Sequence, residues 1–178
     1  DLGVALENIY NFIWNEFCDW YIEMTKSRLY SENNQEKAQV CYVLNYVLRN
    51  SLKLLHPFMP FITSEIYSKL INPDDKDLMV SEWPKVNNSV KYDTNKDFIE
   101  NLKDVITQIR NIRANMNVHP SKKAKLIFVT TEYQKDIEQS KAFIEKLGFA
   151  NEITIQKDKD NIPQNAISII SNGMEVYI

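Results

Sequence analysis

The spacing of apolar residues constrains this chain more than any other feature, and it changes once, after Pro120. Before that point, apolar residues recur at steps of three and four, which place them on one face of an α-helix. After it they alternate with polar residues, which is typical of β-strands. We therefore expect a mainly α fold with two domains. Residues 1–118 are expected to form an antiparallel helix bundle, and residues 119–178 a small α/β subdomain.

Three helices are predicted in the first 72 residues. The first ends before a polar break at residues 31–34. The second spans about residues 35–55, because a residue that precedes a proline such as Pro57 disfavours the helical conformation. The third begins at Pro60, since proline fits the first turn of a helix. The apolar stripe of the first helix comprises Leu6, Ile9, Tyr10, Ile13, Trp14, Phe17, Tyr21 and Met24, and one face of the second comprises Ala38, Cys41, Tyr42, Asn45, Leu48, Leu52 and Leu55.

A fourth helix is predicted after a turn-rich segment. Residues 72–93 are polar, with an extended piece at residues 78–83. Thr94, with Asp97 three residues later, resembles a capping box that opens the helix. The apolar face of this helix comprises Phe98, Leu102, Val105, Ile106, Ile109 and Ile112.

The rest of the chain predicts a strand, a helix and three further strands. The first strand is expected at residues 124–130 and the helix at residues 132–147. Gly148 would then occupy the left-handed position that commonly closes a helix. The further strands are expected at residues 152–156, 165–170 and 174–178, separated by turns at residues 158–161 and 172–173.

Positive charge is concentrated in residues 109–125, IRNIRANMNVHPSKKAK, although the chain as a whole has a net charge of −3. No acidic residue occurs in residues 105–131. A basic segment on an acidic chain favours a polyanionic partner over general solubility.

A polar face of the fourth helix holds candidate RNA contacts. The planar fork of arginine suits phosphate groups and base edges, which favours Arg110 and Arg113. Because Arg113 lies near the apolar edge of the helix, a buried salt bridge to a carboxylate such as Glu16 or Glu23 is its alternative role. The polar face comprises Lys103, Thr107, Arg110, Ala114 and Asn117.

Further basic residues lie outside this face. Lys122 and Lys123, between the fourth helix and the first strand, are expected to add to the positive field. Lys26 and Arg28 close the first helix and form a second candidate contact, although cations at a helix C-terminus also complement its dipole. His119 is either an RNA contact or a linker residue, and His56 is expected to have a structural role at a helix end.

The sequence argues against chemistry performed by this chain alone. Its three glycines form no phosphate-binding loop, and its two histidines and two cysteines are too widely spread for a metal cluster. Glu16, Asp19 and Glu23 share one helix side, where a solvated face is the alternative to an acid–base pair. Cys18 and Cys41 are expected to be buried thiols, with a disulfide as the alternative. Catalytic residues, a metal site and a cofactor are therefore not expected.

The bulk properties fit a soluble piece of a larger protein. Hydrophobic residues make up 44% of the chain, and no apolar run approaches the roughly 18 residues of a membrane span. The chain starts with Asp1 rather than methionine and ends within a predicted strand. We expect a cytoplasmic protein without a membrane partner.

Three segments resemble the anticodon-binding region of the valyl-tRNA synthetase family. They are residues 12–23 (FIWNEFCDWYIE, followed by KSRLY at 26–30), residues 55–67 (LHPFMPFITSEIY) and residues 109–118 (IRNIRANMNV). Trp83-Pro84 matches the WP that follows the third helix in this family. The resemblance spans nearly the whole chain, and its departures are Tyr67 where Trp is common, Ser64 where Glu is common and His119 where Pro is common.

The resemblance implies a tRNA-binding module of a class I synthetase. The full enzyme would join valine to tRNA(Val) using ATP and Mg²⁺, with its catalytic and editing domains upstream in the same chain. The bundle would hold the anticodon stem-loop, with a further helix before residue 1, and the α/β subdomain would lead into a C-terminal arm. We expect a monomer. The alternatives are the equivalent domain of an isoleucyl-type synthetase and a helical protein-interaction module without RNA specificity.

Overall fold

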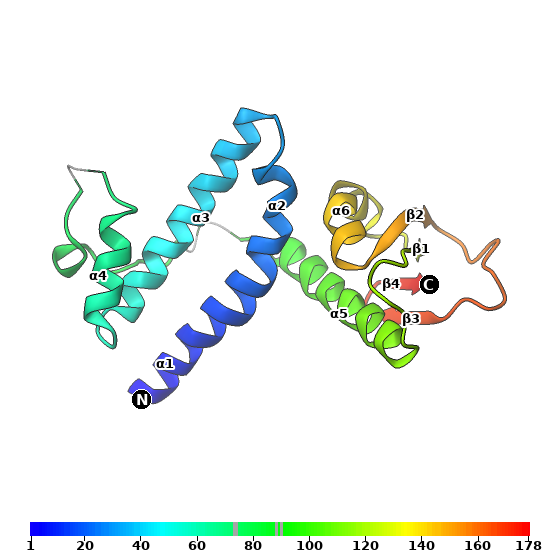
Figure 1. Cartoon of the computed structure of the whole chain (residues 1–178), viewed down its shortest axis with the longest axis horizontal. Coiled ribbons are helices and arrows are strands. Elements are labelled where there is room, and N and C mark those ends of the chain that lie inside the picture. The colour runs from blue at the N-terminus through cyan, green and yellow to red at the C-terminus, as the bar shows by residue number, and fades with distance from the viewer. Residues whose placement is uncertain (73–74, 88, 90) are drawn as a thin grey trace. The chain divides into compact units, whose positions relative to one another are not determined.

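The computed structural model describes residues 1–72, 75–87, 89 and 91–178, which divide into two compact units, Asp1–Asn88 and Ser89–Ile178. The first unit is helical, and the second combines helices with a four-stranded mixed sheet (Figure 1). The mainly α class with a small sheet is thus confirmed. The division after residue 88 precedes the expected boundary at 118, because the long helix α5 (Asp93–Asn115) buries its apolar face in the second unit.

The first helical segment is one continuous rod with a change of hydrogen bonding in its middle. It comprises α1 (Leu2–Asn11), the π-helical segment η1 (Phe12–Ile22) and α2 (Glu23–Leu29). The backbone stays in the right-handed helical region at both junctions, with φ −62° at Phe12 and φ −63° at Glu23. Apolar steps of three and four predict the helix but do not distinguish an α-helix from the rarer, wider π-helix.

The second and third predicted helices are confirmed. The helix α3 spans Asn34–Leu55, and its first turn is capped by the Asn33 side chain, which accepts hydrogen bonds from the Gln35 and Glu36 amides. It contacts both α2 and α4 (Pro60–Ser68). The ring of His56, which follows α3, hydrogen bonds with the Thr63 hydroxyl at 2.8 Å. This contact gives His56 the structural role that the sequence favoured.

The prediction of an extended piece at residues 78–83 is wrong for its first three residues. Leu78–Val80 form a short 3₁₀ helix, η2. Leu78 is buried in a cluster with Leu52 and Tyr67, and both the amide and the hydroxyl of Ser81 donate to its carbonyl. Burial of the leucine together with these two hydrogen bonds favours the tight turn over an extended strand.

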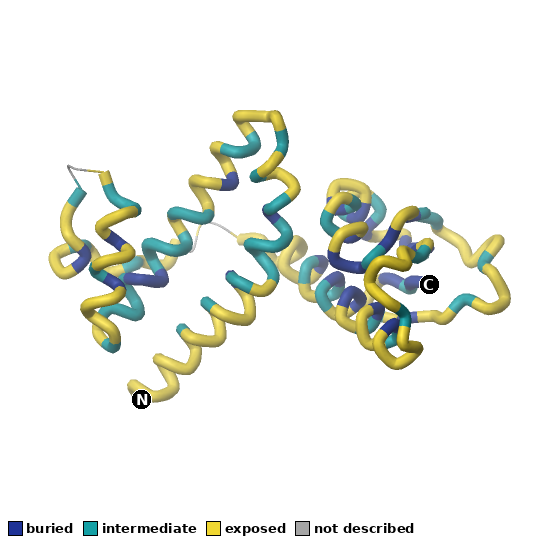
Figure 2. Tube along the Cα trace, viewed as in Figure 1, coloured by how far each residue is buried: buried dark blue, intermediate teal, exposed yellow. Residues whose placement is uncertain are grey.

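Much apolar surface of the first unit is exposed. No residue of α1 is buried, and most of its length is exposed in Figure 2. The described helices of the first unit contact one another in pairs: α1 and α2 each contact α3, and α3 contacts α4. These contacts do not establish a closed antiparallel bundle.

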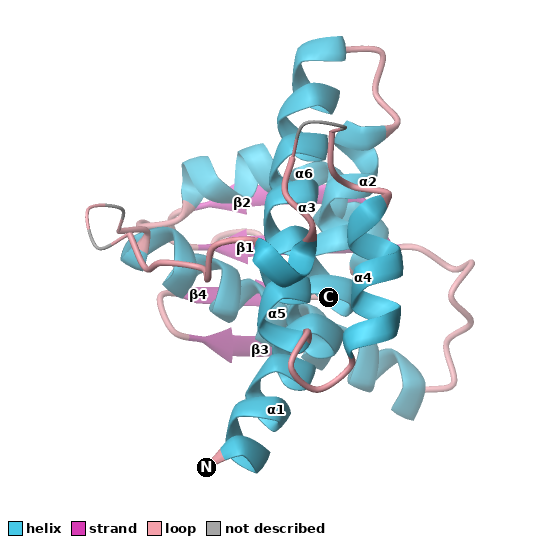
Figure 3. Cartoon of the chain, turned by 90° about the vertical axis from the view of Figure 1, so that its left-hand side faces the viewer, coloured by secondary structure: helices cyan, strands magenta, loops and turns pink. Residues whose placement is uncertain are grey.

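The second unit is built on a sheet with the strand order β2-β1-β4-β3, visible in Figure 3. The strand β1 (Ala124–Val129) pairs in parallel with β2 (Ala150–Gln156) through the crossover helix α6 (Gln134–Leu147). It pairs antiparallel with β4 (Met174–Tyr177), which in turn pairs antiparallel with β3 (Ser168–Ser171). All the strands predicted here are present, although β3 begins later than expected.

Apolar residues from α5, α6 and the sheet form the core of this unit. The helix α6 packs on β2 and α5 on β3, and the two helices contact each other. Fully buried members of the core are Leu102, Val105, Ile106, Ile109, Leu126, Phe128, Ile137, Ile144 and Val176. The apolar face predicted for the fourth helix is therefore the face that is buried, apart from the half-buried Ile112.

Two predicted helix caps are wrong. The helix α5 begins at Asp93, so Thr94 lies inside its first turn. The N-cap residue is Tyr92, whose side chain makes no capping hydrogen bond. Gly148 has φ −89° rather than a left-handed conformation; the left-handed residue is Phe149, with φ 55°. Gly148 is needed for space, because a Cβ there would lie 2.9 Å from the Ile144 carbonyl oxygen.

Candidate nucleic-acid interface

The C-terminal end of α5 carries the basic segment that the sequence singled out. The helix ends in a Schellman motif: the Asn117 amide donates to the Ala114 carbonyl and the Val118 amide donates to the Arg113 carbonyl. Asn117 has the left-handed conformation that this motif requires, with φ 53°. Its exposed side chain is therefore held at a fixed point on the surface.

Arg113 is buried, with 6% of its surface exposed, and it organises the loop that follows α5. Its Nη2 donates to the carbonyls of His119, at 3.2 Å, and of Lys122. The guanidinium also lies 5.4 Å from the centre of the Phe149 ring. These described partners are carbonyls and an aromatic ring of its own unit, rather than the carboxylate that was the alternative for this residue.

Arg110 lies one turn earlier on α5 and is exposed. Its Nε donates to the Leu147 carbonyl at 3.0 Å, and its guanidinium lies 6.0 Å from the Phe149 ring centre. Both arginines therefore meet at Phe149, a residue that the sequence did not single out. The signal for it would have been the aromatic residue that directly follows the helix-ending glycine.

The remaining basic residues of the segment lie at the surface. Lys122 and Lys123 are exposed, and the Lys122 carbonyl is the one that Arg113 binds. His119 is also exposed, and its ring hydrogen bonds with the Ser121 hydroxyl at 2.8 Å. We refer to Arg110, Asn117, Lys122 and Lys123 as the α5 basic end.

Lys103 is separate from this group. It lies seven residues before Arg110, about 10 Å along the helix. Its side chain is 11% exposed and forms an ion pair with Glu100 at 3.2 Å. The structure therefore does not bring Lys103 to the α5 basic end.

The second pair of predicted contacts belongs to the first unit. Lys26 forms an ion pair with Glu23, one turn earlier on the same helix. Arg28 is exposed and lines a groove between α2 and α3 together with Tyr21 and Tyr42. Burial raises the pKa of the Tyr21 hydroxyl, and the nearby charge of Arg28 opposes that shift.

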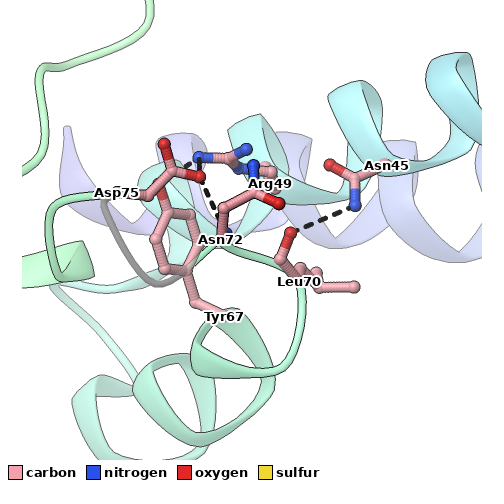
Figure 4. A network of polar contacts seen from close by, with 6 residues as sticks. All are labelled: Asn45, Arg49, Tyr67, Leu70, Asn72 and Asp75. Carbon is pink, nitrogen blue, oxygen red and sulfur yellow. Dashed lines mark hydrogen bonds and ion pairs between the residues drawn. The ribbon is translucent and has the colours of Figure 1, made fainter.

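A polar network that the sequence did not predict joins α3 to the segment after α4 (Figure 4). Arg49 pairs with Asp75 at 3.2 Å and donates to the Tyr67 hydroxyl at 3.3 Å. The side-chain amide of Asn45 donates to the Leu70 carbonyl at 3.3 Å, and the backbone amide of Asn72 donates to the Asp75 carboxylate. The signal was Asn45, a polar residue within the predicted apolar face of the second helix.

That face of α3 is corrected in part by the structure. Cys41 and Tyr42 are exposed, and with Asn45 and Arg49 they line an open groove of about 640 Å³. Farther along the same face, Leu52 is buried as predicted, and Leu48 packs against its cluster. Cys18 is half-buried and Cys41 exposed, and both are free thiols.

Within the described part of the chain, no cluster of three or more His, Cys, Asp or Glu residues is arranged to hold a metal ion. None of the described helices combines the length and the apolar character that a membrane crossing needs.

Residues 1–128 match the family model described as the anticodon-binding domain of tRNA ligase. The chain belongs to this family of anticodon-binding domains. Over its full length, the domain is 41% identical to the valine–tRNA ligase of Clostridium acetobutylicum and 39% identical to that of Clostridium tetani, and it spans 20% of each. It is 36% identical to the valine–tRNA ligase of Aquifex aeolicus and spans 17% of that protein. The resemblance inferred from the sequence is thus confirmed.

Proposed function

We propose that this domain holds the anticodon stem-loop of tRNA(Val) for a valine–tRNA ligase, which charges the tRNA with valine using ATP and Mg²⁺. The observation that carries the proposal is the exposed α5 basic end, which occupies an acid-free segment of a domain in the anticodon-binding family. Chemistry would take place in the catalytic and editing domains upstream, in a monomeric, cytoplasmic enzyme. The domain itself would supply affinity and selectivity, with no catalytic residue and no cofactor.

Contacts to phosphates and contacts to bases would have different roles in this binding. Arg110, Lys122 and Lys123 would contact phosphates, which fixes the orientation of the RNA without reading its sequence. About four to five such contacts, with Lys26 and Arg28 included, give a log–log salt slope of about −3 to −4. Unpaired loop bases can stack on aromatic or guanidinium planes, which stabilises binding by about 1–3 kcal/mol per base.

Arg113 would act through its neighbours. Its bonds to the His119 and Lys122 carbonyls fix the loop on which Lys122 and Lys123 stand. A fixed loop loses less entropy on binding than a mobile one. The exposed helices of the first unit would complete the antiparallel bundle together with a further helix of the full protein.

Replacing Arg110 by alanine in the full-length protein is expected to weaken tRNA(Val) binding about tenfold, because a charge-assisted hydrogen bond contributes about 1.5–3 kcal/mol. The slope of log K against log salt should become shallower by about 0.7–0.9. Valine activation, measured as ATP–pyrophosphate exchange, should be unchanged.

Lys135→Ala is the matched control, because Lys135 is an exposed cation on α6 outside the basic segment. Its tRNA affinity should stay within about twofold of the wild type. Equal affinity of the Arg110 variant and the wild type would remove Arg110 from the contact set. A full-length protein without measurable tRNA affinity would overturn the proposed function itself.

An interaction module without RNA specificity is the second candidate. The exposed apolar residues around α4 favour it, above all Phe61, which is 90% exposed. This candidate predicts no preference among tRNAs and no protection of an anticodon loop in footprinting. The valine–tRNA ligases named above favour the valine enzyme over an isoleucyl-type one.

A further inference from the structure

We propose that one face of α3 is a second RNA contact surface, on which an unpaired base of the bound tRNA stacks. We name this face the α3 strip; it comprises the exposed Gln39, Tyr42 and Tyr46 and the half-buried Asn50 and Lys53. These residues follow one another at steps of three and four, so they share one side of the helix over about 21 Å. The inference rests on the proposed function and adds a surface to it.

A pair of stacked tyrosines forms the centre of the strip. The rings of Tyr42 and Tyr46 lie 6.4 Å apart between centres, with an angle of 20° between their planes. Tyr42 is 71% exposed and Tyr46 57%. Two nearly parallel rings that are open to solvent present a flat π surface, on which any of the nucleobases can stack.

One wall of the groove beside the tyrosines is held by hydrogen bonds and an ion pair. The groove lined by Tyr42 and Tyr46 is bounded by Asn45 and Arg49, which are tied to the segment after α4 by the network of Figure 4. Arg49 is charge-matched by Asp75, so its role here is to fix the wall rather than to attract phosphate. A preformed groove lets a base enter without the cost of ordering its walls.

The charge along the strip favours RNA. Residues 37–64 contain no aspartate or glutamate, although the whole chain has a net charge of −3. Lys53 stands at one end of the strip and forms no ion pair with a described residue. Near the other end, Arg28 lines the groove between α2 and α3, which shares Tyr42 with the first groove. Cations thus flank the aromatic pair at both ends, as phosphates on either side of a stacked base require.

The residue types argue against a docked protein helix as the occupant. A helix-binding groove is lined mainly by aliphatic side chains that receive apolar anchors. The strip instead carries glutamine, tyrosine, asparagine and lysine. Amide groups, aromatic rings and a cation together are the side chains that contact single-stranded RNA.

The test compares two double variants of the full-length protein. Tyr42→Ala/Tyr46→Ala should weaken tRNA(Val) binding about 5-fold to 150-fold, which corresponds to about 1–3 kcal/mol of lost stacking. Tyr42→Phe/Tyr46→Phe keeps both rings and should bind within about twofold of the wild type. Equal affinity of the alanine variant and the wild type would overturn the α3 strip, as would an equal loss in both variants.

Charge and position are tested separately. Lys53→Gln should make the slope of log K against log salt shallower by about 0.7, whereas the tyrosine variants should leave that slope unchanged. Lys37→Gln removes the same charge from a position about 160° away around α3 and should have no effect. An unchanged slope for Lys53→Gln would contradict its phosphate contact.

Cys41 offers a direct probe of occupancy, because it is exposed and lines the groove with Tyr42. In a Cys18→Ser protein, saturating tRNA(Val) should slow alkylation of Cys41 at least about fivefold. Binding of tRNA without this protection would overturn the strip alone, since the proposed function would still hold. A Cys41 that does not react in the free full-length protein would also overturn it, because another domain would then cover the face.

Discussion

Replacing Arg113 by methionine is expected to lower the free energy of unfolding of the second unit by about 2–4 kcal/mol. The substitution removes the buried guanidinium that binds the carbonyls of His119 and Lys122. The Lys122 carbonyl left without the guanidinium costs about 1–3 kcal/mol, and the cation–π contact with Phe149 is lost as well. The His119 carbonyl loses one of two donors, because it still accepts from the Lys122 amide at 3.0 Å. Packing of the methionine on Phe149 offsets part of this loss.

Hydrogen exchange of peptides from α5 and β1 would measure the effect, because local opening is resolved there without an assumption of two-state unfolding. Arg110→Met is the matched control, since it removes an exposed guanidinium from the same helix. It should cost about 1–2 kcal/mol, because it removes the hydrogen bond to the Leu147 carbonyl and the 6.0 Å contact of an exposed guanidinium with the Phe149 ring. Equal destabilisation by the two substitutions would contradict the role assigned to Arg113.

The second large effect is expected at Tyr67, which is 2% exposed and the centre of the small core of the first unit. Tyr67→Ala should destabilise the packing of α3 on α4 by about 3–5 kcal/mol, as for other large aromatic residues in a core. Tyr67→Phe keeps the packing with Leu52 and Leu78 and removes the hydroxyl that accepts from Arg49. It should cost about 1 kcal/mol.

The same exchange measurement on peptides from α3 and α4 distinguishes the two variants. The alanine variant should open α4 far more often than the phenylalanine variant, and α6 should exchange as in the wild type. If both variants lost protection equally, the hydrogen bond rather than the apolar cluster would hold these helices together.

Periodicity sufficed to locate most of the helices and strands, but not to describe how they end. The apolar steps of α3, α5 and α6 were strong enough to predict all three helices. Caps depend on single dihedral angles and on local space, and neither is visible in the pattern. The left-handed residue after α6 is therefore Phe149, and Gly148 is required by its distance from the Ile144 carbonyl.

The apolar face predicted for α3 is confirmed at Leu52 and wrong at Cys41 and Tyr42, and the cause of the error is chemical. Cys41 and Tyr42 count as apolar in a periodic pattern, although both are exposed here. A small helical unit cannot bury every apolar residue. Asn45, which disagreed with the predicted face, was the better guide to where the surface lies.

The candidate site was located by charge and by the order of residues, whereas the tasks of individual residues required the structure. The sequence located the basic segment at the end of the fourth helix, and Arg110, Lys122 and Lys123 are exposed there. The sequence could not distinguish the roles of its two arginines, because the burial of Arg113 depends on carbonyls 6 and 9 residues away and on Phe149, which lies 36 residues away. In the structure, Arg113 is buried and binds the carbonyls of the loop that follows α5, whereas Arg110 is exposed.

The most direct test of the central proposal is the affinity of the full-length protein for tRNA(Val) and for the same tRNA with its anticodon bases replaced. We expect replacement to weaken binding at least about tenfold, because stacking and base-edge contacts contribute about 1–3 kcal/mol each. Changes in the acceptor stem provide the comparison for contacts made elsewhere in the protein. Equal affinity for tRNA(Val) and for the anticodon-replaced tRNA would contradict the assignment of this domain to the anticodon stem-loop.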